Sequence, residues 1–532
     1  MAFLFNEKIN VKPSKLNSKQ HSDQEYDALI KKESGLTFEQ KNASDKRFAQ
    51  KYDKGVGVLG TVVNTIKCSV GAGILSFPYG FYAAGWLGAL VTIATVMLPI
   101  IFCLHKIGHT RRMLIEDRIR QQQTTGLRAD PSITENEVKR LALESRDYLE
   151  FPDMGELSVG KKFSTLITGL VLMGQIGCCA AYVIYIANNL HTIGTSYVAT
   201  SFLPRVVYIG AIFPLVLSLS FVKTLRGLMP IAVLGTLLLI GGLALVGTHG
   251  VQVAQASGKP LSMPPMFGEN VVLFTGMALF SMESVTAMPV LQASMTQPSK
   301  FPKVLNWSVV GLVITYVAVG LGGAVLYGST VDSVITRNMG MTVMGHVTRA
   351  LFCATLLASF PFQLFPAATI LERYLGSSNV DEAARQEEEE RQRGGGGGGE
   401  GGEGDRRNGG RSACHSLMTN YFVLRTMLCL VIVAIAIGFD DFGQFLSLIG
   451  YPCMGTLGLV IPPLMCLSLD MRSKEGRLTT FDRTLCWIIM CVGAVVCLCG
   501  TVYTIADMMS KHRSVAAAET GVPIKSSIQK LF

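Results

Sequence analysis

The sequence predicts an all-α membrane protein with about eleven transmembrane helices, for three reasons. Apolar residues make up 49% of the 532 residues and charged residues only 16%, whereas a soluble chain has about a quarter charged. Apolar runs near the length that crosses a bilayer core of roughly 30 Å recur along the chain. These runs do not alternate apolar and polar residues with period two, which argues against a membrane barrel.

Hydropathy and helix-breaking residues place the expected spans in order along the chain. The fourth and ninth are short, so their ends are the least sharply defined. The predicted spans are 56–82, 86–104, 164–187, 206–221, 228–247, 269–292, 306–327, 348–371, 422–438, 443–468 and 484–506.

The distribution of basic residues predicts the orientation. Lysine and arginine gather before the first span and in every second loop after it, so the N-terminus is expected in the cytoplasm and the C-terminus on the opposite side. The first fifty residues are polar and lack the apolar core of a cleavable signal peptide. The expected organisation begins with a largely disordered cytoplasmic tail at 1–54 and ends with a non-cytoplasmic tail at 509–532. Between them lies a transmembrane core at 55–508, with a cytoplasmic loop at 105–163 and a disordered acidic, glycine-rich cytoplasmic linker at 376–420.

Composition argues against several other functions. The thirteen cysteines lie mostly in apolar stretches without zinc-like spacing, so we predict no metal site and no cofactor. The glycines of the linker have no phosphate-loop spacing and follow no strand. The net charge of +9 fits orientation and contact with the lipid bilayer, and we expect no nucleic-acid partner.

The first span carries the most informative residues. Lys67 stands near its centre, where a charge costs about 2.5–3.5 kcal/mol even on the lenient insertion scale and therefore favours a functional role. Gly71-Ala72-Gly73 weakens the helix at the same depth, since glycine admits non-helical backbone. An opened turn in a membrane frees backbone groups that need a partner. A costly charge beside a breakable turn indicates a binding site.

The sixth span repeats this arrangement. Glu283 lies near its middle, and an isolated carboxylate there is also costly unless it is paired or protonated. Spans one and six are equivalent if the core consists of two five-helix halves. That spacing fits an inverted-repeat transporter, in which broken helices meet at the bilayer midplane.

Several motifs resemble the amino acid/auxin permease family, closest to its proton-coupled and vacuolar amino-acid transporter branches. The run NTIKCSVGAGILSFPYGFYAAGW is similar to the family's first-span signature, and FPDMGELSVGKK to its segment before the third span. FTGMALFSMESVTAMPVLQ resembles the sixth-span signature, although Ser284 stands where the family usually has glycine. The segments LYGSTVDSVITRN, SFPFQLFPA and FLSLIGYPCMGTLGLVIPPL are similar to later span motifs, so the resemblance covers about residues 55–506.

The resemblance implies an amino-acid carrier with a 5+5 inverted-repeat core of the LeuT/APC type plus one helix. Amides at Gly71, Ala72 and Gly73 would bind the substrate carboxylate at a helix N-terminus. Carbonyls near Phe280 and Ser281 would accept the substrate ammonium. Further substrate-binding candidates, chosen as polar or aromatic residues facing the expected cavity, are Gln175, Tyr182, Gln363 and Tyr451.

Amino-acid transport could be coupled to an ion in more than one way. Lys67 could replace a sodium ion as a fixed positive charge, could form a proton-dependent pair with Glu283, or could only fix helix packing. We favour proton coupling over sodium coupling because the Lys67 match belongs to proton-using branches and Glu283 can titrate. Ser359 with carbonyls near Gly71 could instead form a sodium site.

The expected function is therefore secondary active amino-acid transport by alternating access, and not enzymatic catalysis. A channel would need a continuous polar lining, and no clustered catalytic groups support an enzyme. An amino-acid sensor on the same fold is the more serious alternative. The plasma membrane and a vacuolar or lysosomal membrane both fit, while oligomeric state and the choice between neutral and cationic amino acids stay open.

Overall fold

A computed structural model describes most of the helical core. The described residues are 57–125, 150–197, 204–221, 229–256, 263–281, 285–293, 295, 300–374, 422–473 and 476–520. The predicted N-terminal tail and the glycine-rich linker lie outside them.

Within this part of the chain the structure is almost entirely helical. Its first half contains α3 (Val58–Ser69), η2 (Ala72–Ser76), α4 (Phe77–Ala84), α5 (Trp86–Thr125), α7 (Phe151–Ser158), α8 (Lys161–Tyr197), α9 (Arg205–Ser220) and α10 (Met229–Ala256). Its second half contains α11 (Val271–Ser281), η4 (Val285–Ala287), α12 (Met288–Ala293), α13 (Phe301–Tyr327), η6 (Gly328–Thr330), η7 (Ile335–Met339), α14 (Val343–Tyr374), an unlabelled helix Phe422–Gly438, α17 (Phe442–Ile449), η8 (Gly450–Val460), α18 (Ile461–Arg472) and α19 (Thr480–Thr520).

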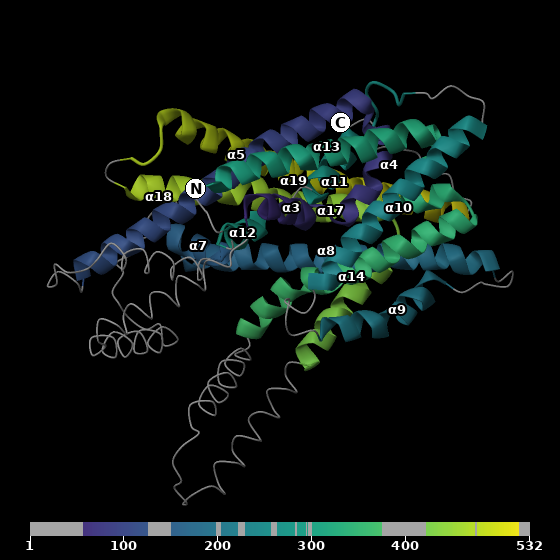
Figure 1. The fold of residues 1–532 in the computed structure, drawn as a ribbon, viewed down its shortest axis with the longest axis horizontal. Coiled ribbons are helices and arrows are strands. Elements are labelled where there is room, and N and C mark those ends of the chain that lie inside the picture. Colours follow the sequence, from purple (N-terminus) through teal and green to yellow (C-terminus); the bar gives the residue numbers. More distant parts are fainter. Residues whose placement is uncertain are drawn as a thin grey trace, which may run out of the picture.

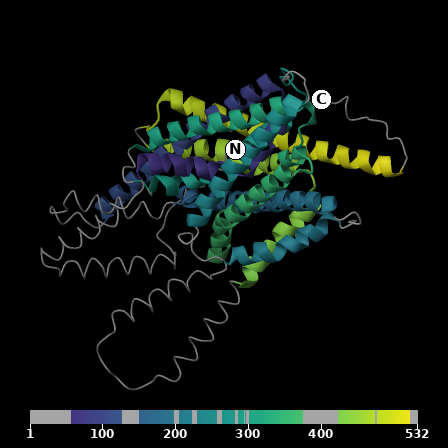
Figure 2. The same cartoon turned by 45° about the vertical axis from the view of Figure 1, so that its right-hand side comes forward.

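The helices form one bundle around α11. Most of the long helices run side by side, and α9, α10 and α14 gather along one side of the bundle (Figures 1 and 2). The central helix α11 packs against α4, α5, α17, η8 and α19. All eleven of its residues except Val271, Val272 and Thr275 are buried, so α11 is enclosed by protein and not by lipid.

The first span is interrupted where the sequence predicted a weak turn. The helix α3 ends at Ser69, and Val70 is extended with φ −82° and ψ 96°. Gly71 is also extended, with φ −110° and ψ −159°, after which the tight helix η2 and then α4 resume the span. The three β-branched or small residues Thr61, Thr65 and Ser69 donate their hydroxyl hydrogens to carbonyls one turn earlier in α3. These bonds favour bending of a helix near its end.

The sixth span consists of two described pieces. The helix α11 ends at Ser281, and η4 with α12 covers residues 285–293. Residues 282–284, which include Glu283 and Ser284, lie outside the described part. The first and sixth spans therefore each begin with a regular helix that ends at a serine near the middle of the predicted span, Ser69 in α3 and Ser281 in α11.

The tenth span contains an element that hydropathy does not reveal. Between α17 and α18, residues Gly450–Val460 form a π-helix, η8. Pro452 has no amide hydrogen and three glycines lie in this stretch, which together loosen the normal i to i−4 ladder. A π-helix inside a longer helix often accompanies a functional site.

Seven described helices are long and apolar enough to cross a membrane. They are α5, α8, α10, α13, α14, the continuous unit α17–η8–α18, and α19. Shorter apolar helices at α9, at α11 and at Phe422–Gly438 fall where three more spans were predicted. The count of eleven stays a prediction. Several helices extend well past the apolar stretch, α5 to Thr125 and α19 to Thr520.

Candidate functional site

The ends of the first and sixth half-helices meet at a single side chain. The hydroxyl of Tyr316, on α13, lies 3.0 Å from the carbonyl oxygen of Ser69 and 2.7 Å from that of Ser281. These are the last residues of α3 and α11. All three residues are buried. The hydroxyl has one hydrogen to donate and two acceptors within reach, so the carbonyl pair is incompletely satisfied by Tyr316 alone.

The site is negative on this side because of helix geometry. The last carbonyls of a helix have no partner in their own helix and together carry roughly half a negative charge. Two such ends, those of α3 and α11, point at the Tyr316 hydroxyl. A converging pair of carbonyl ends is suited to a cation or an ammonium group.

Directly beside it, the chain restarts as a helix. Gly71 precedes η2, and the first amides of η2 belong to Ala72 and Gly73. The first amides of a helix have no acceptor in the helix itself and carry partial positive charge. They are suited to a carboxylate. The broken turn thus places the two kinds of helix end next to each other.

Gly73 makes the closest contact between the two interrupted spans. A Cβ atom on Gly73 would lie 1.8 Å from the Ser281 Oγ, 2.7 Å from its Cβ and 3.2 Å from its Cα. No residue with a side chain fits there unless Ser281 moves. The Ser281 hydroxyl is held in place because it donates to the carbonyl of Met277 at 2.7 Å. The glycine is therefore required by close packing of the two broken spans.

The third span contributes two of the predicted residues. Tyr182 on α8 has its hydroxyl 3.7 Å from the position of a Cβ on Gly71, so it covers the broken turn. Gln175 lies seven residues earlier, which places it on the same face of the helix. Its side chain is 7% exposed, and its Oε1 has no hydrogen-bond partner among the described residues. A buried amide oxygen without a partner is costly and indicates a ligand or water contact.

Other predicted candidates have their polar groups engaged in the fold. Tyr451, at the start of η8, donates its hydroxyl hydrogen to the carbonyl of Val272 at 2.6 Å. Ser359 on α14 donates to the carbonyl of Thr355 at 2.9 Å, and Gln363 lies one turn further along and is half-buried. Phe280 is buried at the end of α11. Their roles in binding stay predictions.

The proposed coupling pair lies at the same two helix ends by position in the chain. Lys67 belongs to the last turn of α3, two residues before Ser69, and Glu283 follows Ser281 by two residues. The side chain of Lys67 and the whole of Glu283 lie outside the described structure. Their contact therefore stays a prediction.

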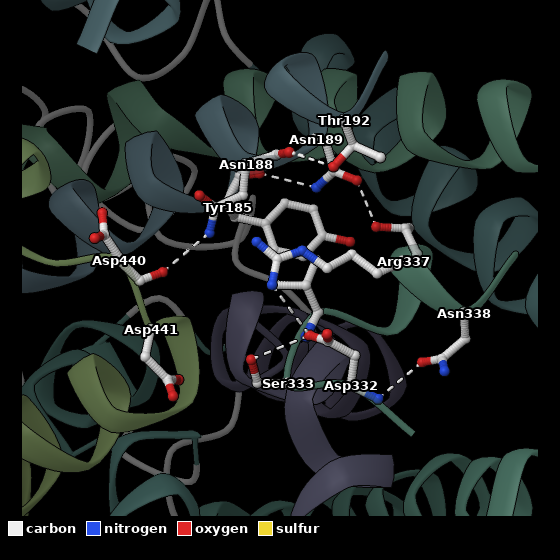
Figure 3. A network of polar contacts seen from close by, with 12 residues as sticks. Tyr185, Asn188, Asn189, Thr192, Asp332, Ser333, Arg337, Asn338, Asp440 and Asp441 are labelled. Carbon is white, nitrogen blue, oxygen red and sulfur yellow. Dashed lines mark hydrogen bonds and ion pairs between the residues drawn. The ribbon is translucent and has the colours of Figure 1, made fainter. Parts of the chain in front are cut away.

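A polar network covers the other end of α8 (Figure 3). Asn188 donates through its Nδ2 to the carbonyl of Asp440 at 3.3 Å, and the Asn189 Oδ1 accepts a hydrogen bond from Thr336. In the connection between α13 and α14, Arg337 pairs with Asp332 at 3.4 Å. The network joins three segments one to three turns beyond Tyr182.

A buried arginine holds the connection between α13 and α14 in place. Arg349, on α14, donates to the carbonyls of Thr336 at 3.0 Å and Gly340 at 2.8 Å. The carbonyl contacts fix the backbone of η7, whereas the side-chain pair of Arg337 and Asp332 is half-exposed. The connection between α13 and α14 is therefore held at η7 by Arg349, whereas its exposed polar contacts exchange easily with water.

Sequence reasoning missed Tyr316 and this outer network. A tyrosine in an apolar helix predicts ordinary packing, and its two acceptors lie 247 and 35 residues away. The available signal was the residue type, because a buried tyrosine hydroxyl usually finds a partner. The partners of the network likewise come from segments far apart in sequence.

Comparison with known proteins decides the family. The family model described as transmembrane amino acid transporter protein matches residues 54–506. This chain belongs to that family. It is 24% identical over 463 residues to amino acid transporter AVT3B of Arabidopsis thaliana, covering 85% of this chain and 94% of that protein. It is also 24% identical to the proton-coupled amino acid transporter-like protein pathetic of Drosophila melanogaster, covering 83% and 81% of the two chains.

Solved structures confirm the fold class. The inward-facing conformation of Mhp1, a nucleobase-cation-symport-1 family transporter, matches with a TM-score of 0.50 at 13% identity over 88% of this chain and 92% of that one. The protein is an all-helical membrane protein with a LeuT-type core, as predicted. As a member of this family it is a multi-pass transporter of amino acids and not an enzyme, and both predicted locations, the plasma membrane and a vacuolar membrane, agree with that assignment.

Proposed function

We propose that this protein is a proton-coupled amino-acid symporter that works by alternating access. The substrate is a zwitterion whose carboxylate binds the amides of Ala72 and Gly73 and whose ammonium binds near the carbonyls of Ser69 and Ser281. The observation that carries the proposal is the convergence of both carbonyls on the Tyr316 hydroxyl, directly beside the restart of the helix at η2.

The electrostatics of the site suit both ends of an amino acid. The amides supply positive partial charge and the carbonyls supply negative partial charge, each roughly half an elementary charge per helix end. An ammonium has three hydrogens to donate, whereas Tyr316 has one. Substrate binding would therefore complete the hydrogen bonding of a carbonyl pair that the Tyr316 hydroxyl satisfies only in part.

Proton coupling is supported by the position of Glu283 in the sequence. The residue follows Ser281, the last residue of α11, by two positions, and we expect a carboxylate there to lie near the ammonium. A carboxylate at that depth becomes neutral when it is protonated, which lowers the cost of moving it through a closed state. A relative in Drosophila carries the name proton-coupled amino acid transporter-like protein, which points in the same direction.

Alternating access requires covers that open in turn. The network of Asn188, Asn189, Asp332, Arg337 and Asp440 covers one end of the bundle beyond Tyr182 (Figure 3). Opening this cover breaks the exposed pair of Arg337 and Asp332, worth about 0–1 kcal/mol, and also the buried hydrogen bond from Thr336 to Asn189.

Uptake by purified protein in proteoliposomes tests the proposal. We expect labelled amino acid to accumulate when the opposite compartments differ in pH, with no requirement for sodium. Glu283→Gln should bind substrate but lose the dependence of uptake on the pH gradient. Uptake that requires sodium and ignores the pH gradient would refute proton coupling.

Sodium coupling is the alternative that keeps the same site. The hydroxyl of Ser359 donates to Thr355, which leaves its oxygen lone pairs available to a cation. Counterflow separates both kinds of carrier from a sensor, because a carrier exchanges labelled substrate across the membrane and a sensor only binds it.

A further inference from the structure

A cavity lies between α5, α12 and α13 and is lined by no residue of the broken turns. It has a volume of about 180 Å³, several times the share of one water molecule in the liquid, about 30 Å³. It is lined by His105, Lys106, Gly108, His109, Arg112, Gln292, Phe301, Pro302 and Leu305. No described residue of the substrate site lines it.

One face of α5 supplies most of the polar lining. His105, Gly108, His109 and Arg112 have the spacing i, i+3, i+4 and i+7, which places them on one side of a helix. The absence of a side chain at Gly108 allows the ring of Phe301 to lie 3.5 Å from the position of its Cβ. Three nitrogen-bearing side chains therefore face the start of α13.

The charges favour an anion. Lys106 is paired with Asp482 at 2.9 Å, while Arg112 is an exposed guanidinium. Arg111, on the adjacent face, donates to Gln292 Oε1 at 3.5 Å. Asp482 is the carboxylate that contacts a lining cation in the described structure, so the cavity keeps an excess of basic groups. Arginine and lysine at such a position bind phosphate oxygens by charge-assisted hydrogen bonds.

The N-terminus of α13 adds to this preference. The helix is 27 residues long, begins at Phe301 and has no side-chain cap at Lys300. Its first turn, Phe301 and Pro302, borders the cavity. Amides at an uncapped helix start attract phosphate, and Phe301 and Lys303 supply them here because Pro302 has no amide hydrogen. The helix start thus supplements the basic side chains.

The helix α5 continues from the cavity into an exposed apolar surface. Leu98 is 67% and Val91 49% exposed, and both lie on the face of His105, seven and fourteen residues before it. An apolar stripe that becomes basic at one end follows the outline of a phospholipid, whose acyl chains and phosphate occupy those two environments.

We infer that this cavity binds the phosphate headgroup of an anionic phospholipid on the predicted cytoplasmic side. The basic residues of the α5 face and the start of α13 hold the phosphate. The exposed apolar residues beside the cavity hold the acyl chains. A phospholipid and a soluble phosphate share the phosphate group that the basic residues recognise. The exposed apolar residues of α5 favour the membrane lipid.

Native mass spectrometry of the purified full-length protein tests this inference. The probes are phosphatidylinositol 4-phosphate, phosphatidylcholine and the soluble inositol 1,4-bisphosphate. We expect one phosphatidylinositol 4-phosphate to bind in preference to phosphatidylcholine, and soluble inositol 1,4-bisphosphate to compete only at much higher concentration. Arg112→Gln should weaken the binding of the anionic lipid by about tenfold, the effect of one lost charge-assisted contact.

Lys162→Gln is the matched control. Lys162 is also exposed and basic, and it lies at the predicted cytoplasmic end of α8, outside the cavity. We expect the Lys162→Gln variant to bind the lipid with the affinity of the unmodified protein. Equal weakening by both substitutions would mean nonspecific charge attraction and would overturn the inference. So would unchanged binding by Arg112→Gln, or displacement of the lipid by inositol 1,4-bisphosphate at equal concentration.

Discussion

Replacing Tyr316 by phenylalanine removes the hydroxyl that lies within hydrogen-bond distance of the last carbonyls of both interrupted helices. The substitution keeps the ring, which packs against Phe77 with ring centroids 4.4 Å apart, and deletes only the hydroxyl. The buried carbonyls of Ser69 and Ser281 then lose the donor that lies 3.0 and 2.7 Å from them. Leaving a buried acceptor without its donor costs about 1–3 kcal/mol.

That energy translates into an effect on transport. If the cost falls on the geometry of the ammonium site, substrate affinity decreases by roughly 5- to 150-fold, since about 1.4 kcal/mol equals a factor of ten. We expect the KM for uptake to rise within this range, because the two carbonyls repel each other once the hydroxyl is gone. The assay is initial-rate uptake of labelled amino acid into proteoliposomes at a fixed pH gradient.

Tyr327→Phe provides a control on the same helix. Its hydroxyl donates to the carbonyl of Val246 at 3.0 Å and is also buried, but it lies far from the broken turns. Both variants should lose similar thermal stability, whereas only Tyr316→Phe should raise KM. If Tyr316→Phe transports with KM and maximal rate within about twofold of the unmodified protein, the role assigned to the hydroxyl is wrong.

Further predictions follow from the close contacts, the cytoplasmic end and the linker. Gly73→Ala should reduce uptake at least about tenfold, because its Cβ would lie 1.8 Å from the Ser281 Oγ. Adding Ser281→Gly should restore part of the rate, and a lack of rescue would contradict the contact. Gly169→Ala is the control, since nothing lies within 4 Å of its Cβ position. Asp470, just past the predicted tenth span, accepts hydrogen bonds from the amides of Arg477 and Leu478 at 2.7 and 2.8 Å and from Arg483. These donors stabilise the charged carboxylate. Asp470→Asn should therefore lower the melting temperature at pH 7, and an unchanged melting temperature would contradict this. Deleting residues 380–412 should leave uptake unchanged if that segment only regulates transport, and loss of uptake by a well-folded deletion variant would show that the segment takes part in it.

The sequence was sufficient for the features that depend on local chemistry. The charge of Lys67 and the glycines at 71 and 73 are visible in the chain, and the first span is interrupted there. Apolar runs located the helices of the core. The ends of the helices were harder to predict from hydropathy. A helix such as α5 continues to Thr125 after its apolar stretch has ended, because polar residues also form helices in water.

Features that depend on distant contacts could not be predicted. Tyr316 became recognisable only when α3 and α11 brought their last carbonyls to it. The π-helix η8 has a sequence that also suits an ordinary span. The bond from Tyr451 to Val272 requires the packing of the tenth span on α11, so a residue predicted to face the substrate also stabilises the scaffold.

A structure of the protein with bound amino acid, determined by electron cryomicroscopy, tests the central claim most directly. We expect density for the carboxylate within hydrogen-bond distance of the amides of Ala72 and Gly73, and for the ammonium near the carbonyls of Ser69 and Ser281. Continuous helical hydrogen bonding from Ile66 to Pro78, with the amino acid bound elsewhere or absent at saturating concentration, would contradict it.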